Sequence, residues 1–439
     1  MRIPKRYVPI LLALSLILWI SCSNRERTQP AAPTPLTETA ERQPTPSKPV
    51  VMPTGASALQ MSEAGLDLVF SGGGAKGIAH IGALMELEKR GLTYRRVVGT
   101  SSGSIMALML AAGYNTDEMV AAITERTPDG KIIMASFLDT PASFSEEVIH
   151  DSFLYTLIEN AILSDLPDPF KSEARKFAVE ELMASPVIRE AFAFTEYGGV
   201  YTGDVFLQWL NEKLDQNGRQ LSQLSLSEFH QETGSDLTAI ITDINDQRML
   251  VVNHRTAPDL PVSMLIRMSM SIPLVYKNVI WQPEWGTYAG EDISGHEIVD
   301  GGIGSNFGIE MVVSQDSQFV DAMGMEPDRK RVIGLYLNDA IPVPGGEQDA
   351  SEPERNMSSL QNGWDKVTKR NIDLFNAVLR SHDQFIIRTH PDIVCHLPVG
   401  GVGTMEFDMS DARIALLLHA GQEAMAGCLD ALDMGQGYP

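Results

Sequence analysis

The sequence predicts an α/β fold, a three-layer arrangement with a mainly parallel central sheet flanked by helices, and three observations support this. Short apolar runs typical of buried strands alternate with helical patterns at the start of the folded region. Glycine-rich turns join those strands to the helices that follow them. Hydrophobic residues make up 44% of the 439 residues, which is enough for a sizeable core.

The folded region opens with two strand–helix pairs. Residues 66–70 form an apolar run, and residues 78–90 show a helical pattern in which Glu86 is expected to face solvent. A second strand at 95–100 precedes an apolar helix, and Asn115 is placed to cap the next one. Consecutive strands joined through helices predict parallel pairing.

The rest of the chain is predicted to complete this domain, which we place at 66–435. A polar, mainly helical stretch at about 128–235 is predicted to be an insertion, because it shows no strand pattern. The sheet is expected to resume after it, and an amphipathic helix closes the chain. The predicted later strands are 237–244, 248–252, 297–300 and 331–337.

The charge balance excludes two classes of partner. There are 34 Lys and Arg against 57 Asp and Glu, a net charge of −23. Nucleic-acid binding needs clustered positive charge, so no nucleic-acid partner is expected. The same acidity argues against electrostatic docking on anionic lipid.

The N-terminus predicts export and a lipid anchor. Basic residues precede an apolar run at 8–20, which suits a signal peptide over 1–21 and is short for a membrane-spanning helix. The following Cys22 resembles the lipidated cysteine of bacterial lipoproteins, although Trp19 stands where such motifs usually carry an aliphatic residue. Residues 22–65 would then be the lipid anchor and a Pro-rich linker. The protein is therefore expected to be exported and attached to a membrane as a lipoprotein that faces the periplasm or the cell surface.

The two remaining cysteines are predicted to be buried thiols, with a single bridge between Cys395 and Cys428 as the alternative. Cys395 lies near His390 and His396, but their spacing matches no standard zinc pattern, so no metal site is expected.

A glycine loop follows the first strand. Residues 72–77 satisfy GxGxxG, yet the second strand lacks the acidic residue that a dinucleotide site needs at its end. A P-loop is excluded because Gly77 follows Lys76 where Ser or Thr is required. No nucleotide cofactor is therefore expected. The unhindered N–H groups of this loop, at the start of a helix, could instead stabilise an oxyanion.

A GxSxG motif stands on the next strand-to-helix turn. Gly99 and Gly103 flank Ser101, and a sharp turn of this kind exposes its serine at a helix N-terminus. A matching acid is Asp300, which ends an apolar strand and precedes Gly301 and Gly302. We expect Asp300 at the edge of the sheet where parallel strands end. Apolar neighbours, including Ile303, are expected to raise its pKa by burial.

These elements resemble the patatin-like phospholipases. SGGGAKG, GTSSG and DGG occur in that family's order, with weaker similarity in GVYTGD, ITDI, MSMSIPLVY and VGTMEFDMS. The resemblance implies that Ser101 is the nucleophile and Asp300 its proton acceptor in a Ser–Asp dyad. It also implies an oxyanion hole, and a basic residue at Lys76. The implied oxyanion residues are Gly72, Gly73 and Gly74. Phe307 and Gly308 depart from the family pattern.

The expected function is a lipid acyl hydrolase that cleaves fatty acyl esters of phospholipids or lysophospholipids through an acyl-enzyme, without cofactor or metal. One alternative is an α/β-hydrolase esterase with a Ser–His–Asp triad, for which His390, His396 and His419 are available. The other is a non-catalytic surface lipoprotein that binds lipid or a partner. The oligomeric state is left open.

A first prediction concerns the anchor. Cys22→Ser should leave the protein soluble or as an unprocessed precursor. The reason is that the lipid anchor alone would attach the protein to the membrane, since no basic patch is expected to help. Membrane fractionation of cells expressing each form measures this. A correctly cleaved Cys22→Ser protein that still sediments with membranes would contradict the anchor.

Overall fold

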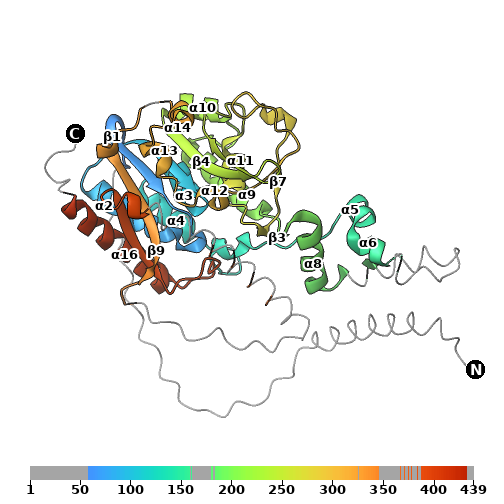
Figure 1. Ribbon diagram of the computed structural model, residues 1–439. Coiled ribbons are helices and arrows are strands. Elements are labelled where there is room, and N and C mark those ends of the chain that lie inside the picture. Colours follow the sequence, from blue (N-terminus) through green and yellow to red (C-terminus); the bar gives the residue numbers. More distant parts are fainter. Residues whose placement is uncertain are drawn as a thin grey trace, which may run out of the picture. The chain divides into compact units, whose positions relative to one another are not determined.

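A computed structural model gives the fold (Figure 1). It describes residues 58–158, 160, 179–180, 183–324, 326–345, 366, 370, 374, 377, 383 and 387–432. The chain divides into two compact units, one of residues 54–140 and 197–439, the other of residues 1–53 and 141–196. The predicted signal peptide and Cys22 lie outside the described residues, as does nearly all of the predicted linker.

The larger unit is built on one mixed sheet with the order β10-β9-β1-β2-β4-β8-β7, and β5 pairs with β4. Strands β1, β2, β4, β9 and β10 pair in parallel, as the alternation of strands and helices predicted. The strands are β1 (Met61–Phe70), β2 (Tyr94–Thr100), β4 (Asp236–Asp243), β5 (Arg248–Val252), β7 (Val279–Ile280), β8 (Glu297–Asp300), β9 (Val332–Pro342) and β10 (Val394–Gly400). The expected fold class is confirmed.

Helices cover this sheet. One face is packed by α2 (Ile78–Lys89), α3 (Ser102–Ala111) and α16 (Asp411–Ala431). The other face carries α13 (Glu310–Val313) and α14 (Ser317–Met323), whose side chains join Val69, Val98 and Ile240 in one buried cluster. The capping box that Asn115 and Glu118 predicted is present at the start of α4 (Thr116–Ile123).

The α2–α16 contact shows why one predicted surface residue is buried. A Cβ on Gly82 would lie 2.0 Å from the Leu418 carbonyl oxygen, so the helices cross with almost no room between their backbones. Glu86 is consequently only 3% exposed, which corrects the expectation that it faces solvent. Lys89 and Arg90 pair with its carboxylate at 2.9 and 3.0 Å, which offsets the cost of burying the charge.

Strand β8 runs against the expected direction. It is antiparallel to β4, with Asp300 opposite Ile241. Its chain therefore runs in the direction opposite to that of the parallel strands. Ile240 pairs in turn with Thr100 of β2. This register still places Asp300 level with the end of β2. The expectation that Asp300 would end a parallel strand was wrong, because β8 is antiparallel.

The predicted insertion at 128–235 divides between the units. Residues 197–235 belong to the larger unit and contain β3 (Gly199–Tyr201), α9 (Asp204–Asp215) and α10 (Leu226–Thr233), besides the 3₁₀ turn Gln216–Gly218. Strand β3 pairs with β6 (Leu274–Tyr276) in a separate two-stranded sheet. The larger unit also holds α11 (Val262–Ser269), α12 (Gly302–Ser305) and 3₁₀ turns at Gly74–Gly77, Ile133–Phe137, Pro283–Trp285 and Arg329–Arg331.

The described part of the smaller unit is mainly helical. Its helices are α5 (Glu146–Asp151), α6 (Phe153–Ile158) and most of α8 (Pro186–Tyr197). Phe144 and Phe192 pack together within it at a tilted angle, with ring centroids 4.4 Å apart. Across the part of the chain that the structure describes, we find no helix with both the length and the apolar character needed to cross a bilayer.

Cys395 and Cys428 form a disulfide, which corrects the prediction of two free thiols. Cys395 lies in β10 and Cys428 in α16, and the contact between these elements brings their Cα atoms to 5.7 Å. That separation is within the range a disulfide requires. The bridge ties α16 to the sheet beside α2, the helix that follows the glycine loop.

Removing this bridge should lower the free energy of unfolding by about 3–4 kcal/mol, since it closes a long loop in the unfolded chain. The sequence separation of the two cysteines is 33 residues. Urea unfolding of wild type and of the Cys395→Ala/Cys428→Ala variant, each with and without reductant, measures the effect. Reductant should destabilise only the wild type, and equal unfolding midpoints in all four samples would contradict the bridge.

Candidate active site

Ser101 occupies a strained turn between β2 and α3. Its φ and ψ are 52° and −126°, a combination that residues with a side chain seldom adopt. The flanking glycines allow the turn: a Cβ on Gly99 would lie 2.4 Å from the Gly103 carbonyl oxygen, and one on Gly103 would lie 2.4 Å from that of Phe70. Backbone strain of this kind concentrates at functional sites.

The glycine loop lies directly beside this serine. A Cβ on Gly72 would come within 2.3 Å of the Asn306 Oδ1 and 3.1 Å of the Ser101 Cβ, so a side chain here would require its neighbours to move. Gly74 has a φ of 58° and no room for a Cβ, because the Thr404 carbonyl oxygen would be 2.2 Å away. That same oxygen accepts a hydrogen bond from the Ala75 N–H at 2.9 Å and fixes the loop.

The loop offers fewer N–H donors than the sequence suggested. The Gly72 N–H donates to the Asn306 carbonyl oxygen at 2.9 Å and is therefore engaged. For Gly73 and Gly74, no backbone hydrogen bond occupies the N–H among the described residues. These two groups remain as candidate oxyanion donors.

Asp300 is buried beside the serine turn, with 1% of its surface exposed. Burial raises the pKa of its carboxyl to about 7, against hydrogen bonds from Ser101 and the Gly302 N–H that lower it. The Gly302 N–H donates to Oδ1 at 2.8 Å, whereas Oδ2 has no partner of strict hydrogen-bond geometry. The Ser101 hydroxyl is thus near the carboxyl but not ideally aligned, as is common without substrate. The expected apolar enclosure holds for Ile298 and Val299 but not for Ile303, which is 40% exposed.

The last residue of α11 and the residues just after the helix brace both Ser101 and Asp300. The Ser269 hydroxyl accepts the Ser101 N–H at 3.0 Å and donates to the Ile240 carbonyl oxygen at 2.8 Å. Two residues later, the Ser271 carbonyl oxygen accepts the Asp300 N–H at 2.8 Å. Sequence analysis did not assign these serines a role, although MSMSIPLVY was among the segments similar to the patatin-like family.

Arg267 lies in α11 and holds this region in place through its hydrogen bonds. It is 3% exposed, and its guanidinium donates to the Thr202 carbonyl oxygen at 2.5 Å, the Lys277 carbonyl oxygen at 3.2 Å and the Ser271 hydroxyl. Gly203 makes room for it, since a Cβ there would lie 2.6 Å from the arginine Nε. The GVYTGD and MSMSIPLVY segments therefore meet at one arginine.

Two pockets of opposite character meet at Ser101. The apolar one has a volume of about 60 Å³ and is lined mainly by aliphatic and aromatic side chains, among them Met106, Phe137, Trp209 and Phe407. The polar one has a volume of about 40 Å³ and contains Ser101 and Asp300 together. An ester with its carbonyl at Ser101 could place an acyl chain in the first and its alcohol in the second.

Lys76 lies in the wall of the polar pocket. Its ammonium group pairs with Asp339 at 2.7 Å, and its side chain is only 7% exposed. The lysine charge is therefore already balanced by a carboxylate within the same wall.

Among the described residues, no histidine lines either pocket. His80 is fully buried and bonds the Ser71 carbonyl oxygen at 2.9 Å, and burial lowers its pKa to about 4. His390 pairs with Arg329, His396 bonds Asn338 at 3.1 Å, and His419 faces solvent near Glu423. Each of these rings has a partner that accounts for its position away from Ser101.

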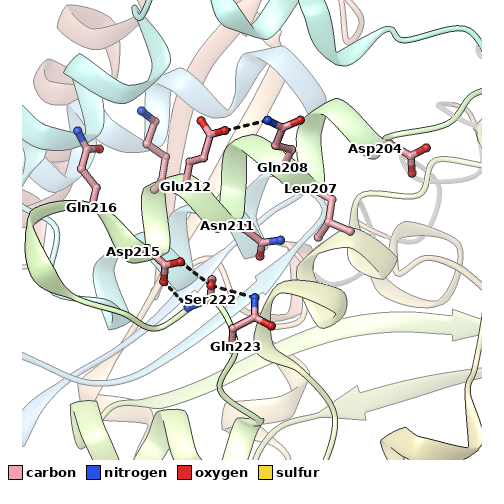
Figure 2. A pocket seen from close by; sticks show the side chains of 10 residues that line it. Asp204, Leu207, Gln208, Asn211, Glu212, Asp215, Gln216, Ser222 and Gln223 are labelled. Atoms are coloured by element: carbon pink, nitrogen blue, oxygen red, sulfur yellow. Dashed lines mark hydrogen bonds between the residues drawn. The ribbon is translucent and has the colours of Figure 1, made fainter.

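A wider hollow lies elsewhere, along α9 (Figure 2). Its volume is about 770 Å³, but it is open to solvent and its polar side chains bind one another. Gln208 donates to Glu212 at 2.9 Å, and the Ser222 hydroxyl donates to Asp215 at 2.7 Å.

One group of side chains has the composition of a metal site. Ligand atoms of Asp243, Asp246 and His296 lie within 4.8 Å of one another. However, Asp243 is already saturated, since Oδ1 accepts the N–H groups of Asn245 and Asp246 and Oδ2 lies 2.8 Å from the His296 ring. Arg248 adds a positive charge 3.9 Å from the same carboxylate, which disfavours a cation there.

The fold and site define a class of protein, namely an α/β protein with a serine on a strained strand-to-helix turn and a buried aspartate beside it. The patatin-like phospholipase family model matches residues 68–313, more than half of the chain, and the chain belongs to this family. Membership supports a lipid-hydrolysing enzyme.

The chain is similar in sequence or structure to several known proteins. The uncharacterized protein YqhO of Bacillus subtilis is 26% identical over 81% of this chain and 95% of its own length. Lysophospholipase NTE1 of Meyerozyma guilliermondii is 43% identical, but over only 13% of this chain and 4% of its own. The crystal structure of VipD from Legionella pneumophila covers 88% of this chain and 72% of its own, with 15% identity and a TM-score of 0.39.

Burial of Asp300 leads to a prediction about stability. Because its pKa is raised to about 7 in the folded protein, the native state holds a proton that the unfolded chain releases near pH 4. Protonation of Asp300 therefore makes its full contribution to the free energy of unfolding below about pH 4. This contribution is lost as the pH rises through about 7. Asp300→Asn should therefore be more stable than wild type at pH 8 by a few kcal/mol, with little difference at pH 4.

Urea unfolding of both proteins at the two pH values measures this difference. The exposed Asp321→Asn serves as the control and should show no such pH-dependent gain. An Asp300→Asn protein no more stable than wild type at pH 8 would show that Asp300 is not held in an environment that disfavours its charge.

Proposed function

We propose that this protein is a serine lipid acyl hydrolase that cleaves fatty acyl esters of phospholipids or lysophospholipids through a Ser101–Asp300 dyad. The observation that carries the proposal is the strained Ser101 placed beside a buried carboxyl whose pKa is raised to about 7. A carboxylate with a pKa near neutral pH is a far better proton acceptor than an ordinary aspartate.

The chemistry follows from these groups. Asp300 takes the Ser101 hydroxyl proton as Oγ attacks the ester carbonyl, and the N–H groups of Gly73 and Gly74 stabilise the resulting oxyanion. Collapse of this intermediate expels the alcohol, which receives the proton from Asp300. Water, deprotonated by the same carboxylate, then releases the fatty acid from Ser101.

The apolar pocket supports an acyl chain as the part of the substrate that enters the fold. Its wall continues from Ser101 to side chains of α3 and α9, which offer apolar contact and few polar groups. Burying an acyl chain there gains about 0.8 kcal/mol for each methylene removed from water.

We further propose that the protein is exported and held on a membrane through Cys22. The disulfide between Cys395 and Cys428 supports export, because structural disulfides persist mainly outside the reducing cytosol.

The dyad predicts which variants lose activity. Ser101→Ala and Asp300→Asn should each lower hydrolysis of a short-chain acyl ester by at least a thousandfold, since each removes one partner of the proton transfer. Single replacements of His80, His390, His396 and His419 should retain most of the activity. Hydrolysis rates and fluorophosphonate labelling of Ser101, measured on variants with native circular dichroism, test both statements.

A single histidine variant as inactive as Ser101→Ala, while folded, would replace the dyad with a Ser–His–Asp triad. A wild-type protein that hydrolyses no acyl ester and takes up no fluorophosphonate would instead favour the non-catalytic lipid-binding alternative.

A further inference from the structure

A second buried carboxyl lines the polar pocket, and neither the dyad nor the oxyanion loop uses it. Asp383 is 1% exposed and borders the same pocket as Ser101 and Asp300. It lies beyond residues 68–313, so the match to the patatin-like family does not include it. Sequence analysis gave no sign of it, because nothing in its sequence neighbourhood resembles a motif.

The contacts of Asp383 leave one oxygen without a partner. Asn306 Nδ2 donates to Oδ2 at 2.7 Å, and a hydrogen bond with Tyr336 also acts on the carboxyl. No hydrogen-bond partner reaches the buried Oδ1 among the described residues. A buried acceptor left in this state is unfavourable, so a ligand that donates a hydrogen bond to it gains binding energy.

The charges around the pocket restrict what that ligand can be. Three carboxyl groups line it, those of Asp300, Asp339 and Asp383. Among the described residues that line the pocket, Lys76 is the one cation, and it is paired with Asp339. A phosphate at this point would face these carboxyl groups and a lysine whose charge is already paired, which disfavours an anion.

Size and hydrogen-bond chemistry then favour a hydroxyl group. The pocket volume of about 40 Å³ has room for a small polar group. Burial raises the pKa of Asp383 to about 7, so both its charged and neutral forms occur near neutral pH. A hydroxyl can donate to the first form and accept from the second.

We propose that Asp383 is a specificity-determining residue that binds a free hydroxyl on the alcohol portion of the ester, so that the enzyme prefers monoacyl polyol esters over esters lacking that hydroxyl. This proposal rests on the proposed function, because it assigns the polar pocket to the alcohol and the apolar pocket to the acyl chain.

Asp383 also has a structural connection to the catalytic groups. Through Asn306, whose carbonyl oxygen holds the Gly72 N–H, it is linked to the glycine loop. A purely supporting role through this link would change the turnover of every ester by the same factor. Discrimination between two esters is therefore the measurement that separates hydroxyl binding from support.

The experiment compares 1-octanoylglycerol with its di-O-methyl ether, which has the same acyl chain and ester but no free hydroxyl. Wild type should favour the free glycerol ester by at least tenfold in kcat/KM, since a site built for a hydroxyl rejects an analogue that lacks one. In Asp383→Ala this ratio should fall to about one, and in Asp383→Asn it should be partly retained. The exposed Asp392→Ala is the matched control and should keep the wild-type ratio.

An Asp383→Ala protein that keeps the wild-type ratio would overturn the proposal, as would a wild type without preference. Calorimetric binding of both esters to Ser101→Ala, with and without Asp383→Ala, gives the same comparison without turnover. If the wild type hydrolyses neither ester but Ser101→Ala binds the free glycerol form through Asp383, the proposed function fails and the hydroxyl subsite stands. Equal binding of both esters would remove the subsite.

Discussion

The strained backbone of Ser101 is the constraint on which the rest of the site depends. A residue with a side chain holds a φ of 52° only if its surroundings compensate for the strain. Here Gly99 and Gly103 allow the neighbouring backbones to approach, and the Ser269 hydroxyl holds the Ser101 N–H. The serine thus stands at the start of α3, where two pockets of opposite polarity meet.

The second requirement is a carboxyl that can accept a proton near neutral pH, and burial provides it. Asp300 comes from an antiparallel strand, and its backbone N–H is fixed by the Ser271 carbonyl oxygen. Because Ser269 ends α11 and Ser271 follows it by two residues, the two proposed catalytic groups share a single support. Arg267 stabilises this region by donating a hydrogen bond to the Ser271 hydroxyl. The raised pKa of Asp300 means that the folded protein gives up stability at neutral pH to keep this carboxyl buried, and the proposed dyad would use it as the proton acceptor.

Much of the fold, and the candidate residues Ser101 and Asp300 that the structure brings together, could be picked out from the sequence because they depend on local patterns. Strand β2, helix α3 and the capping box at Asn115 follow from hydrophobic periodicity and local hydrogen bonding. Other features depend on which elements pack together, and there the predictions were wrong. Glu86 is buried because α16 crosses α2, and Cys395 meets Cys428 because α16 packs on β10.

By itself, the sequence determined the α/β class, the glycine loop, the serine turn and the aspartate that follows a strand, since each is encoded within a few consecutive residues. Only the tertiary structure decided the direction of β8, the engagement of the Gly72 N–H and the presence of Asp383 at the site. Asp383 and Asn306 are separated by 77 residues, so no local pattern could relate them. Contacts over such distances arise from packing and sheet register, which hydrophobic periodicity alone does not specify.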